Sequence, residues 1–410
     1  MAFKLRDYQE EAVQKAVYFF NHDKESSALI VAPTAAGKSL YVANICDRLL
    51  GHVLVLQPNK EILEQNYEKF TSYGGHAGIF SASAGRKDVS RVTFATAGSV
   101  KNAINKFLHV KQVIIDEAHL QTNPKQGMMK DILDKIGGGE KPKVLGLTAT
   151  PFRMYPVMGG SMLKFLTRTH PKMFSKLIHY VQISELKKRG YLAELKYYNV
   201  LKGFDRNQIK VNSTGSDFDE ESLKEYYDTI NFKHDIVDIV NRINKQGRRV
   251  LCFTSFVSDA EYVAAHLRNS AVVHGKTKKK ERERIVDAFK SGKLDSVINV
   301  GVLTTGFDDP QLQAIVGARP TRSLALYYQM TGRGFRIHPD KEDCWVVDMV
   351  NNFGVFGRVE DLKVEFEGKY KNLPMITGKG GKKLTGVLLS NNENMSLEKK
   401  EYQEKLYGFR

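Results

Sequence analysis

The chain has 410 residues, of which 42% are hydrophobic and 26% are charged, and its formal net charge is +16. This length allows two domains with separate cores, and this composition is typical of globular proteins, which argues against a disordered or fibrous chain. No run of about 18 apolar residues that could span a membrane is present. The start of the chain, Met1–Arg6, lacks the apolar stretch of a signal peptide. We therefore expect a cytoplasmic protein with no membrane contact.

The positive charge, with an isoelectric point near 9.4, favours a polyanionic partner such as nucleic acid. General solubility or an acidic protein partner would explain the charge as well, so motifs must decide. Cys46, Cys252 and Cys344 are far apart and odd in number. We expect buried free thiols here, and neither a zinc site nor a disulfide.

Short apolar runs alternate with helix-like stretches from the N-terminus onward. Two of these stretches, 39–50 and 60–72, are expected to be helices. The runs expected to form strands of a first sheet are 28–32, 53–56, 92–95, 112–116 and 143–148. Near-continuous apolar strands separated by helices indicate a parallel sheet that is covered on both faces.

The same alternation restarts after a break. The second set of expected strands is 250–254, 271–273, 296–300, 314–317 and 344–348. The sequence therefore predicts an α/β fold with two parallel-sheet domains in tandem, at 1–155 and 204–357. A small basic segment, 156–203, lies between them, and a short C-terminal extension, 358–410, follows.

The inserted segment 156–203 has a composition of its own. Its part from 160 to 203 contains nine Lys or Arg against two Glu, with six aromatic residues interleaved: Phe165, Phe174, Tyr180, Tyr191, Tyr197 and Tyr198. Positive charge and rings together are suited to gripping a nucleic acid backbone and stacking on bases, which predicts contact with duplex or junction DNA. A linker or a small aromatic core is the alternative. In the extension, we expect a flexible hinge at 378–383 and a polar helix at 396–407.

A candidate phosphate-binding loop, Ala-Pro-Thr-Ala-Ala-Gly-Lys-Ser, occupies 32–39. It lies between an expected strand and an expected helix, where backbone N–H groups and a helix N-terminus converge on phosphates. Lys38 would reach the β- and γ-phosphates of ATP, and Ser39 would give its hydroxyl to Mg²⁺. Alanine stands at 32 and 35, where glycine is common. Because alanine resists positive φ, we expect the loop to keep mostly to ordinary backbone conformations.

Two adjacent acids, Asp116 and Glu117, follow the strand expected at 112–116. This places them at the end of a strand, on the same edge of the sheet as the phosphate loop. Asp116 would bind Mg²⁺, and Glu117 would orient and deprotonate the attacking water. A solvated acidic turn is the alternative, which the loop 78 residues upstream makes less favourable.

The chain resembles the superfamily 2 helicases in the order of several motifs. These are the phosphate loop, the Asp-Glu-Ala-His string (DEAH box) at 116–119, Leu-Thr-Ala-Thr-Pro at 147–151, and Gln-x-x-Gly-Arg-x-x-Arg at 329–336. The resemblance covers about residues 3–350 and implies two RecA-like domains with ATP in the cleft between them. The compact layout and the patch at 190–192 resemble RadD-like and phage UvsW-like helicases, which act on branched DNA, although the usual long accessory domains are missing.

The resemblance also implies roles for individual residues. Gln9 and Arg6 would read the adenine, Gly306 and Asp308 would approach the ribose, and Arg333 and Arg336 would act as arginine fingers. The phosphate loop would contribute Thr34, Ala35, Ala36, Gly37, Lys38 and Ser39 to the nucleotide, with Ser39 and Asp116 as metal ligands. Residues that would couple the γ-phosphate to the grip on the strand are His119, Thr148, Thr150 and Gln329.

Superfamily 2 members hold a nucleic acid strand mainly by its phosphates, for which hydroxyls and helix N-termini are suited. Each candidate could also be an ordinary helix cap. The candidates for this track are Pro58, Asn59, Lys60, Thr96, Ser99, Ser255, Thr304 and Thr305.

Together these features predict a monomeric DNA helicase or translocase that depends on ATP and Mg²⁺. We expect it to act on single-stranded, forked or branched DNA in replication, recombination or repair. Its expected location is a bacterial cell or a phage-infected host. Leu-Thr-Ala-Thr-Pro-Phe-Arg at 147–153 resembles DNA-remodelling members of the superfamily. An RNA helicase, or a duplex-DNA translocase that does not unwind, is the alternative. A scaffold with an inactive ATP site is disfavoured, because the motif residues are all present.

Overall fold

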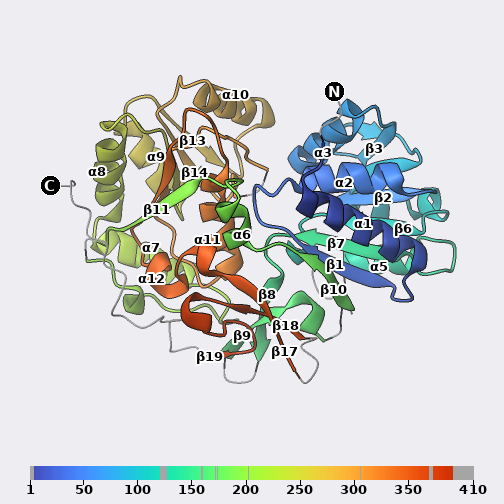
Figure 1. The fold of residues 1–410 in the computed structure, drawn as a ribbon. Coiled ribbons are helices and arrows are strands. Elements are labelled where there is room, and N and C mark those ends of the chain that lie inside the picture. The colour runs from blue at the N-terminus through green and yellow to red at the C-terminus, as the bar shows by residue number, and fades with distance from the viewer. Residues whose placement is uncertain are drawn as a thin grey trace. The chain divides into compact units, whose positions relative to one another are not determined.

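The structure, a computed structural model, describes residues 4–120, 127–157, 160–170, 172, 174–201, 203–304, 306–368 and 373–390. Thr305 and the stretch 396–407 lie outside the described residues. The chain divides into two compact units (Figure 1). The first unit combines Met1–Arg153, Lys164–Gln182 and Val364–Met375, and the second combines Met154–Leu163, Ile183–Lys363 and Ile376–Arg410.

The first unit is built on an eight-stranded sheet with the order β10-β1-β7-β6-β2-β5-β3-β4. Neighbouring strands are parallel, except that the short β4 runs antiparallel to β3 at the edge. The strands are β1 (Ser27–Val31), β2 (Val53–Gln57), β3 (Ala77–Ser81), β4 (Arg86–Lys87), β5 (Val92–Thr96), β6 (Gln112–Ile115), β7 (Lys143–Thr148) and β10 (Lys176–Tyr180).

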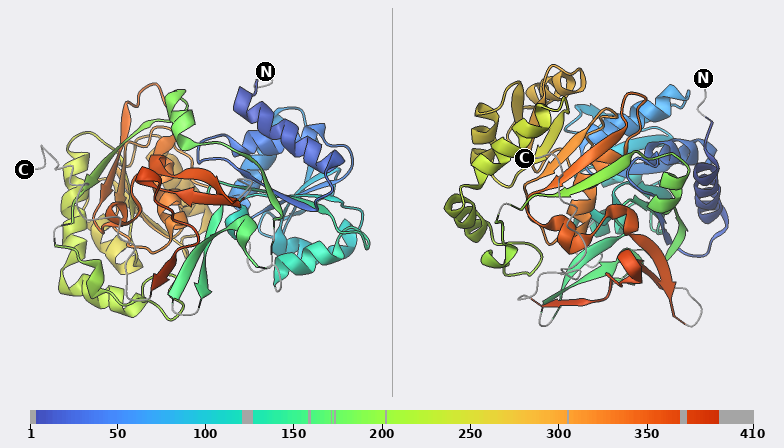
Figure 2. Two further views of the ribbon diagram at one scale, coloured as in Figure 1. Left: turned by 60° about the horizontal axis from the view of Figure 1, so that its bottom comes forward. Right: turned by 60° about the vertical axis from the view of Figure 1, so that its left-hand side comes forward.

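The central strands of this sheet are buried over most of their length, because helices cover both faces (Figure 2). Helices α1, α2 and α3 pack side by side in that order. The helices of the unit are α1 (Asp7–His22), α2 (Lys38–Arg48), α3 (Lys60–Ser72), α4 (Ala97–Lys101) and α5 (Met128–Lys135). Short 3₁₀ turns are η1 (Ile104–Phe107), η2 (Ala118–Leu120) and η3 (Leu166–Arg168).

The second unit has a six-stranded, all-parallel sheet with the order β11-β16-β15-β12-β14-β13. Its strands are β11 (Glu194–Asn199), β12 (Val250–Phe253), β13 (Ser270–His274), β14 (Ser296–Val300), β15 (Ala314–Gly317) and β16 (Asp343–Asp348). Its helices are α6 (Ile183–Lys188), α7 (Glu220–Thr229), α8 (Phe232–Asn244), α9 (Val257–Ala265), α10 (Lys279–Lys290), α11 (Leu324–Thr331) and α12 (Asn352–Phe356). Short turns are η4 (Arg206–Gln208), η5 (Gly332–Phe335), η6 (Val359–Asp361) and η7 (Lys379–Gly381).

The predicted α/β class and both parallel sheets are confirmed, and each of the ten predicted strands lies within two residues of an observed one. The sequence did not predict β3, β4, β10 and β11, which complete the two sheets. Strand β10 is the edge neighbour of β1, and β11 is the edge neighbour of β16. Edge strands are only partly buried, so their apolar pattern is weaker and harder to recognise.

The segment 156–203 does not form one separate body in this structure. Its strand β10 belongs to the first unit and its strand β11 to the second. Strands β8 (Phe152–Val157) and β9 (Gly160–Phe165) form a three-stranded sheet with β19 (Leu388–Ser390) from the extension. In the described chain, each of the two units combines three separate stretches of sequence. The domain boundaries at 155, 203 and 357 stay a prediction.

The extension also contributes to both units. Strands β17 (Lys363–Glu367) and β18 (Leu373–Thr377) form a two-stranded sheet, and the Gln182 side chain exchanges two hydrogen bonds with the backbone of Val364. The stretch expected to be a hinge is instead closed by backbone hydrogen bonds, from Gly378 N to Lys382 O and from Leu384 N to Ile376 O. Local pairing at both ends makes 378–383 a tight turn.

The aromatic residues of the inserted segment divide into two groups. Phe165, Phe174 and Tyr197 are buried, so their rings pack in cores as the alternative interpretation holds. Tyr180 is 37% exposed, and its ring lies against that of Phe366. Stacking on bases by the three buried rings is therefore excluded in this conformation.

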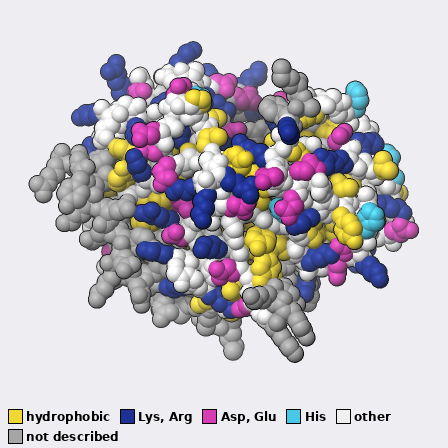
Figure 3. Space-filling model, in the orientation of Figure 1, with side chains coloured by type: hydrophobic (Ala, Val, Ile, Leu, Met, Phe, Trp, Pro, Cys, Tyr) yellow, Lys and Arg dark blue, Asp and Glu magenta, His cyan; other side chains and the backbone are white. Residues whose placement is uncertain are grey.

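All three cysteines are free and buried, as predicted. In the described part of the chain, no helix is long and apolar enough to cross a membrane. On the face that Figure 3 shows, Lys and Arg side chains are spread out with acidic ones between them. The excess positive charge is thus not gathered there into one uniform patch.

His179 in β10 provides a test of this fold. Burial, together with the charge of Lys15, lowers the pKa of His179 to about 4. Since the unfolded chain binds this proton near pH 6.5, the stability that neutral His179 contributes is full above pH 6.5. It is lost as the pH falls toward 4, at a rate of up to about 1.4 kcal/mol per pH unit.

Urea unfolding of the His179→Leu variant should therefore depend less on pH between 6.5 and 4 than unfolding of the parent. The matched control is His76→Leu, because His76 is exposed. An unchanged slope in the His179 variant would contradict the buried neutral imidazole.

Candidate active site

The carboxyl ends of three adjacent strands bring the first group of predicted residues together. In the sheet, β7 lies between β1 and β6. The phosphate loop follows β1, Thr148 ends β7, and Asp116 follows β6. Because parallel strands in register end at the same edge, these three segments share that edge. The backbone N–H of Ala32 donates to the carbonyl of Thr148, which fixes the start of the loop to β7.

The phosphate loop departs from the backbone expected for alanine. Ala35 has φ of 68° and Gly37 has φ of 84°, both in the left-handed region. The expectation that alanine keeps the loop in ordinary conformations was wrong at Ala35. A non-glycine residue there costs about 1 kcal/mol, so the contacts of the loop must offset that strain.

Helix α1 supplies such contacts. The Tyr8 hydroxyl donates to the carbonyl of Ala36 at 3.1 Å, and Gln9 Nε2 donates to the same oxygen at 3.0 Å. A Cβ at Gly37 would lie 2.7 Å from Gln9 Nε2, so this position needs glycine for space as well as for φ. The start of α1 and the loop are thus packed as one piece.

The residues predicted to read adenine are therefore partly engaged within the protein. Gln9 Oε1 accepts a hydrogen bond from the Arg6 backbone N–H at 2.9 Å, and the Gln9 side chain is buried. An amide has two N–H donors and two lone pairs, so each end of Gln9 keeps one position that these bonds do not use. The contact of Gln9 and Arg6 with a base stays a prediction.

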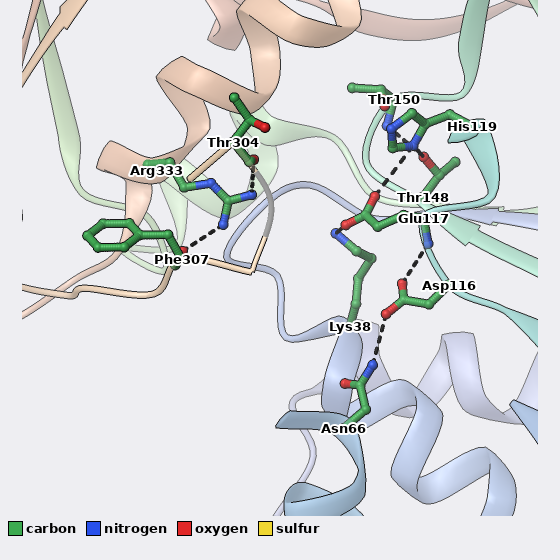
Figure 4. A network of polar contacts seen from close by, with 10 residues as sticks. All are labelled: Lys38, Asn66, Asp116, Glu117, His119, Thr148, Thr150, Thr304, Phe307 and Arg333. Atoms are coloured by element: carbon green, nitrogen blue, oxygen red, sulfur yellow. Dashed lines mark hydrogen bonds and ion pairs between the residues drawn. The ribbon is translucent and has the colours of Figure 1, made fainter. Parts of the chain in front are cut away.

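The two acids of the DEAH string lie in different surroundings (Figure 4). Asp116 is buried and accepts hydrogen bonds from the Glu117 backbone N–H at 2.8 Å and from Asn66 Nδ2 at 2.9 Å. Glu117 adopts φ of 46°, and its Oε1 lies 3.5 Å from Lys38 Nζ. The Lys38 ammonium therefore points at the carboxylate that was predicted to act as the base.

Electrostatics separate the two carboxyl groups. Burial, together with the negative charge of Glu117, raises the pKa of Asp116 to about 6, although the charge of Lys38 and the hydrogen bonds from Glu117 and Asn66 oppose the rise. A cation beside Asp116 would relieve this cost. Burial lowers the pKa of His119, so its imidazole is neutral at pH 7.

The three predicted coupling residues of the first unit form a chain of contacts with Glu117. His119 Nδ1 lies 3.4 Å from Glu117 Oε2 and 2.9 Å from Thr148 Oγ1. The Thr148 hydroxyl in turn accepts from the backbone N–H of Thr150 at 3.0 Å. Nδ1 of a neutral imidazole can donate or accept a hydrogen bond, depending on the tautomer. A proton gained by Glu117 would therefore change which of His119 and Thr148 donates the hydrogen bond between them.

The donor set around Asp116 fits Mg²⁺. This cation takes one or two protein carboxylates and fills its other positions with phosphate and water. Asp116 offers a buried carboxylate whose raised pKa a cation would lower, and Ser39 in the first turn of α2 offers a hydroxyl. Among the described residues no group of three or more His, Cys, Asp or Glu could hold a metal alone, as expected where nucleotide phosphates complete the shell.

The second unit holds the predicted arginines against its own backbone. Arg333 donates from Nη1 to the Phe307 carbonyl at 2.7 Å and from Nη2 to the Thr304 carbonyl at 2.6 Å. Arg336 forms an ion pair with Asp308 at 2.7 Å. The 301–308 loop, with Gly306 at φ of 74°, is thereby joined to η5. Gln329 is buried in α11.

The track residues of the first unit divide between a helix cap and a hydroxyl cluster. Asn59 caps α3, because its Oδ1 accepts from Ile62 N at 2.9 Å, and Lys60 pairs with Glu64. Thr96 Oγ1 lies 3.0 Å from Ser99 Oγ and 3.2 Å from Ser81 Oγ. The cluster of Ser81, Ser83, Thr96 and Ser99 at the ends of β3 and β5 is defined here as the hydroxyl cluster.

In the second unit, the Ser255 hydroxyl lies 3.2 Å from that of Tyr227, which donates to the carbonyl of Ala318. Thr304 is bound through its carbonyl, as described above. Sequence reasoning missed Ser81, Ser83 and Asn66. Asn66 had a usable signal, since it stands four residues from Ile62 and from Phe70, on the buried stripe of α3.

Comparisons with known proteins show which families the chain resembles. The family described as "Type III restriction enzyme, res subunit" matches residues 2–153, and "Helicase conserved C-terminal domain" matches residues 233–338. The chain belongs to the superfamily 2 helicases. These are ATP-hydrolysing enzymes, and the two parallel-sheet domains are RecA-like helicase domains in tandem.

Named relatives cover most of this chain. A putative ATP-dependent helicase, IRC3 of Saccharomyces cerevisiae, is 26% identical over 84% of this chain and 51% of its own length. The DNA 3'-5' translocase XPB2 of Sulfurisphaera tokodaii is 25% identical over 83% of this chain and 80% of its own length. The chain thus spans about half of the yeast relative.

Among solved structures, the Type ISP restriction-modification enzyme LlaBIII bound to DNA aligns with a TM-score of 0.61. It is 16% identical and covers 85% of this chain and 28% of that protein. At this identity the likeness concerns the fold.

Replacing Glu117 by Gln should leave ATP binding intact and lower the turnover of ATP by about 10²–10⁴-fold, because an amide cannot accept the proton of water. Turnover is measured by phosphate release and binding by a fluorescent ATP analogue. Glu140→Gln, at a surface pair with Lys111, is the matched control. Turnover at the parental rate in Glu117→Gln would remove this residue from the role of base.

Proposed function

We propose that the chain is an ATP-dependent DNA helicase or translocase that unwinds or remodels forked or branched DNA. The observation that carries the proposal is the order of polar groups along one edge of the first sheet. The phosphate loop, Thr148 and Asp116 follow β1, β7 and β6, and the start of α3 and the hydroxyl cluster follow β2, β5 and β3. This order supports a site for ATP and a site for a phosphate backbone as neighbours along one sheet.

In this proposal, Lys38 and the backbone of the phosphate loop hold the phosphates of ATP. Asp116 and Ser39 would hold Mg²⁺, which would supply positive charge to neutralise the phosphates. Glu117 takes a proton from the attacking water, and Lys38 Nζ lies 3.5 Å from that carboxylate. His119 and Thr148 then respond to the change of charge on Glu117 through their short contacts.

The arginines of the second unit have separate tasks. Arg333, with two bonds to backbone carbonyls, keeps the 301–308 loop in shape. Arg336 has a half-exposed ion pair with Asp308, which an anionic phosphate can displace. We therefore assign to Arg336 the role of arginine finger and to Arg333 that of its support, with Asp308 released toward the ribose.

The DNA assignment is supported by three points. The net charge of +16 suits a polyanion. The hydroxyl cluster and the capped N-terminus of α3 suit phosphates without reading sequence. The Sulfurisphaera relative is named a DNA translocase. The alternative is an RNA helicase or a duplex translocase that does not separate strands. Action as a monomer is part of the proposal.

One experiment tests the substrate. ATP turnover is measured with single-stranded DNA, forked DNA, a four-way junction and RNA, across a salt series. We expect stimulation by DNA, strongest with the branched forms, and a steep loss as salt rises, because counterions compete for the phosphates. Stimulation by RNA alone would overturn the DNA assignment, and equal stimulation by all DNA forms would overturn the preference for branches.

Removal of the Arg336 side chain by Arg336→Ala should lower ATP turnover by about 10³-fold or more, the range measured for arginine fingers, while the second unit stays folded.

Arg333→Ala should lower ATP turnover and also loosen the 301–308 loop, which hydrogen exchange detects. Arg284→Ala, at an exposed pair with Glu281, is the control. Normal turnover in Arg336→Ala would contradict the finger role.

A further inference from the structure

Helix α3 joins two places that the proposed function uses separately. It begins at Lys60, directly after β2, with Asn59 as its cap. Asn66 stands about 10 Å further along the helix, at 1.5 Å of rise per residue, and contacts Asp116. A rigid element therefore runs from the candidate phosphate-binding start of α3 to the carboxylate that would hold Mg²⁺.

Asn66 occupies a position where the helix pattern calls for an apolar residue. Its side chain is 1% exposed, and the buried residues one turn before and one turn after it are Ile62 and Phe70. A buried amide costs free energy unless its hydrogen bonds are made. Within the described part of the chain, Asn66 Oδ1 has no hydrogen-bond partner. An apolar side chain would fit the stripe better, so packing alone does not account for this amide.

The contact that Asn66 does make is specific. Its Nδ2 donates to Asp116 Oδ2 at 2.9 Å, while the Glu117 backbone N–H donates to Asp116 Oδ1. Two donors on two different oxygens fix the plane of the carboxylate. Each oxygen keeps a lone pair for a cation, with its direction set by α3 on one side and by the backbone after β6 on the other.

A second buried amide, that of Gln57, lies just before the start of α3. Gln57, the last residue of β2, is 2% exposed, and neither atom of its amide has a hydrogen-bond partner among the described residues. Unsatisfied buried polar atoms cost about 1–3 kcal/mol each. The amide of Gln57 is therefore a group beside the start of α3 that can take a hydrogen bond when a ligand binds there.

We propose that Asn66 is a positioning residue that links helix α3 to Asp116, so that a phosphate backbone bound at the start of α3 alters how well Asp116 holds Mg²⁺. The link rests on the proposed function for its DNA part. Its metal part depends only on the contact between the two side chains. Asn66 itself touches neither nucleotide nor nucleic acid.

The test compares the parent with Asn66→Leu, which has similar size and suits the apolar stripe. Two quantities are measured: the binding of Mn²⁺ in the presence of a non-hydrolysable ATP analogue, by electron paramagnetic resonance, and the Mg²⁺ concentration for half-maximal turnover. Loss of a partner in the outer shell weakens metal binding by about 10–100-fold. We expect a shift of at least about tenfold in both, with unchanged or higher stability and a smaller stimulation by DNA.

Phe70→Leu is the matched control, because it disturbs the same stripe of α3 without touching Asp116. It should lower stability and leave Mn²⁺ binding as in the parent. Asn66→Ser, which is smaller and cannot reach Asp116, replaces the Leu variant if that one does not fold. Mn²⁺ binding within twofold of the parent in the folded Asn66 variant overturns the link.

The outcomes separate this link from the DNA assignment. If no DNA stimulates the parent, the proposed function fails, whereas the Mn²⁺ measurement still decides whether Asn66 positions Asp116. If Mn²⁺ binding weakens but stimulation by DNA stays at the parental level, the metal part holds and the coupling through α3 is overturned.

Discussion

The common edge of the parallel strands is the constraint on which the first unit depends. Strands β1, β7, β6 and β2 are neighbours and pair in register, so the segments that follow them emerge side by side. Their burial on both faces leaves the strands no freedom to slip, because a shift of one residue would turn apolar side chains outward. The positions of Lys38, Thr148 and Asp116 follow from this register.

A second constraint is the cost of charge in a buried place. Burial and the negative charge of the adjacent Glu117 disfavour ionisation of Asp116, and the positive charge of Lys38 opposes this. Hydrogen bonds from Asn66 and from backbone fix Asp116. Groups held in this way need little rearrangement when a nucleotide and its metal arrive, which is what efficient phosphoryl transfer requires.

In the second unit, two arginines stabilise a loop. Arg333 satisfies two carbonyls of the 301–308 loop, and Arg336 pairs with Asp308. These bonds keep the two guanidinium groups in defined places. An arginine with an exposed acidic partner can exchange it for a phosphate at low cost, because surface ion pairs contribute about 0–1 kcal/mol.

The sequence by itself determined the fold class, ten strands of the two parallel sheets and the identity of the motif residues, because apolar runs and spaced motifs are local properties of the chain. Tertiary structure decided what depends on distant neighbours. Ala35 has a positive φ beside Ala36, whose carbonyl accepts hydrogen bonds from Tyr8 and Gln9 of α1. The edge strand β10 is recognisable only beside β1. The contact of Asn66 with Asp116 joins residues 50 positions apart, so no local pattern could reveal it.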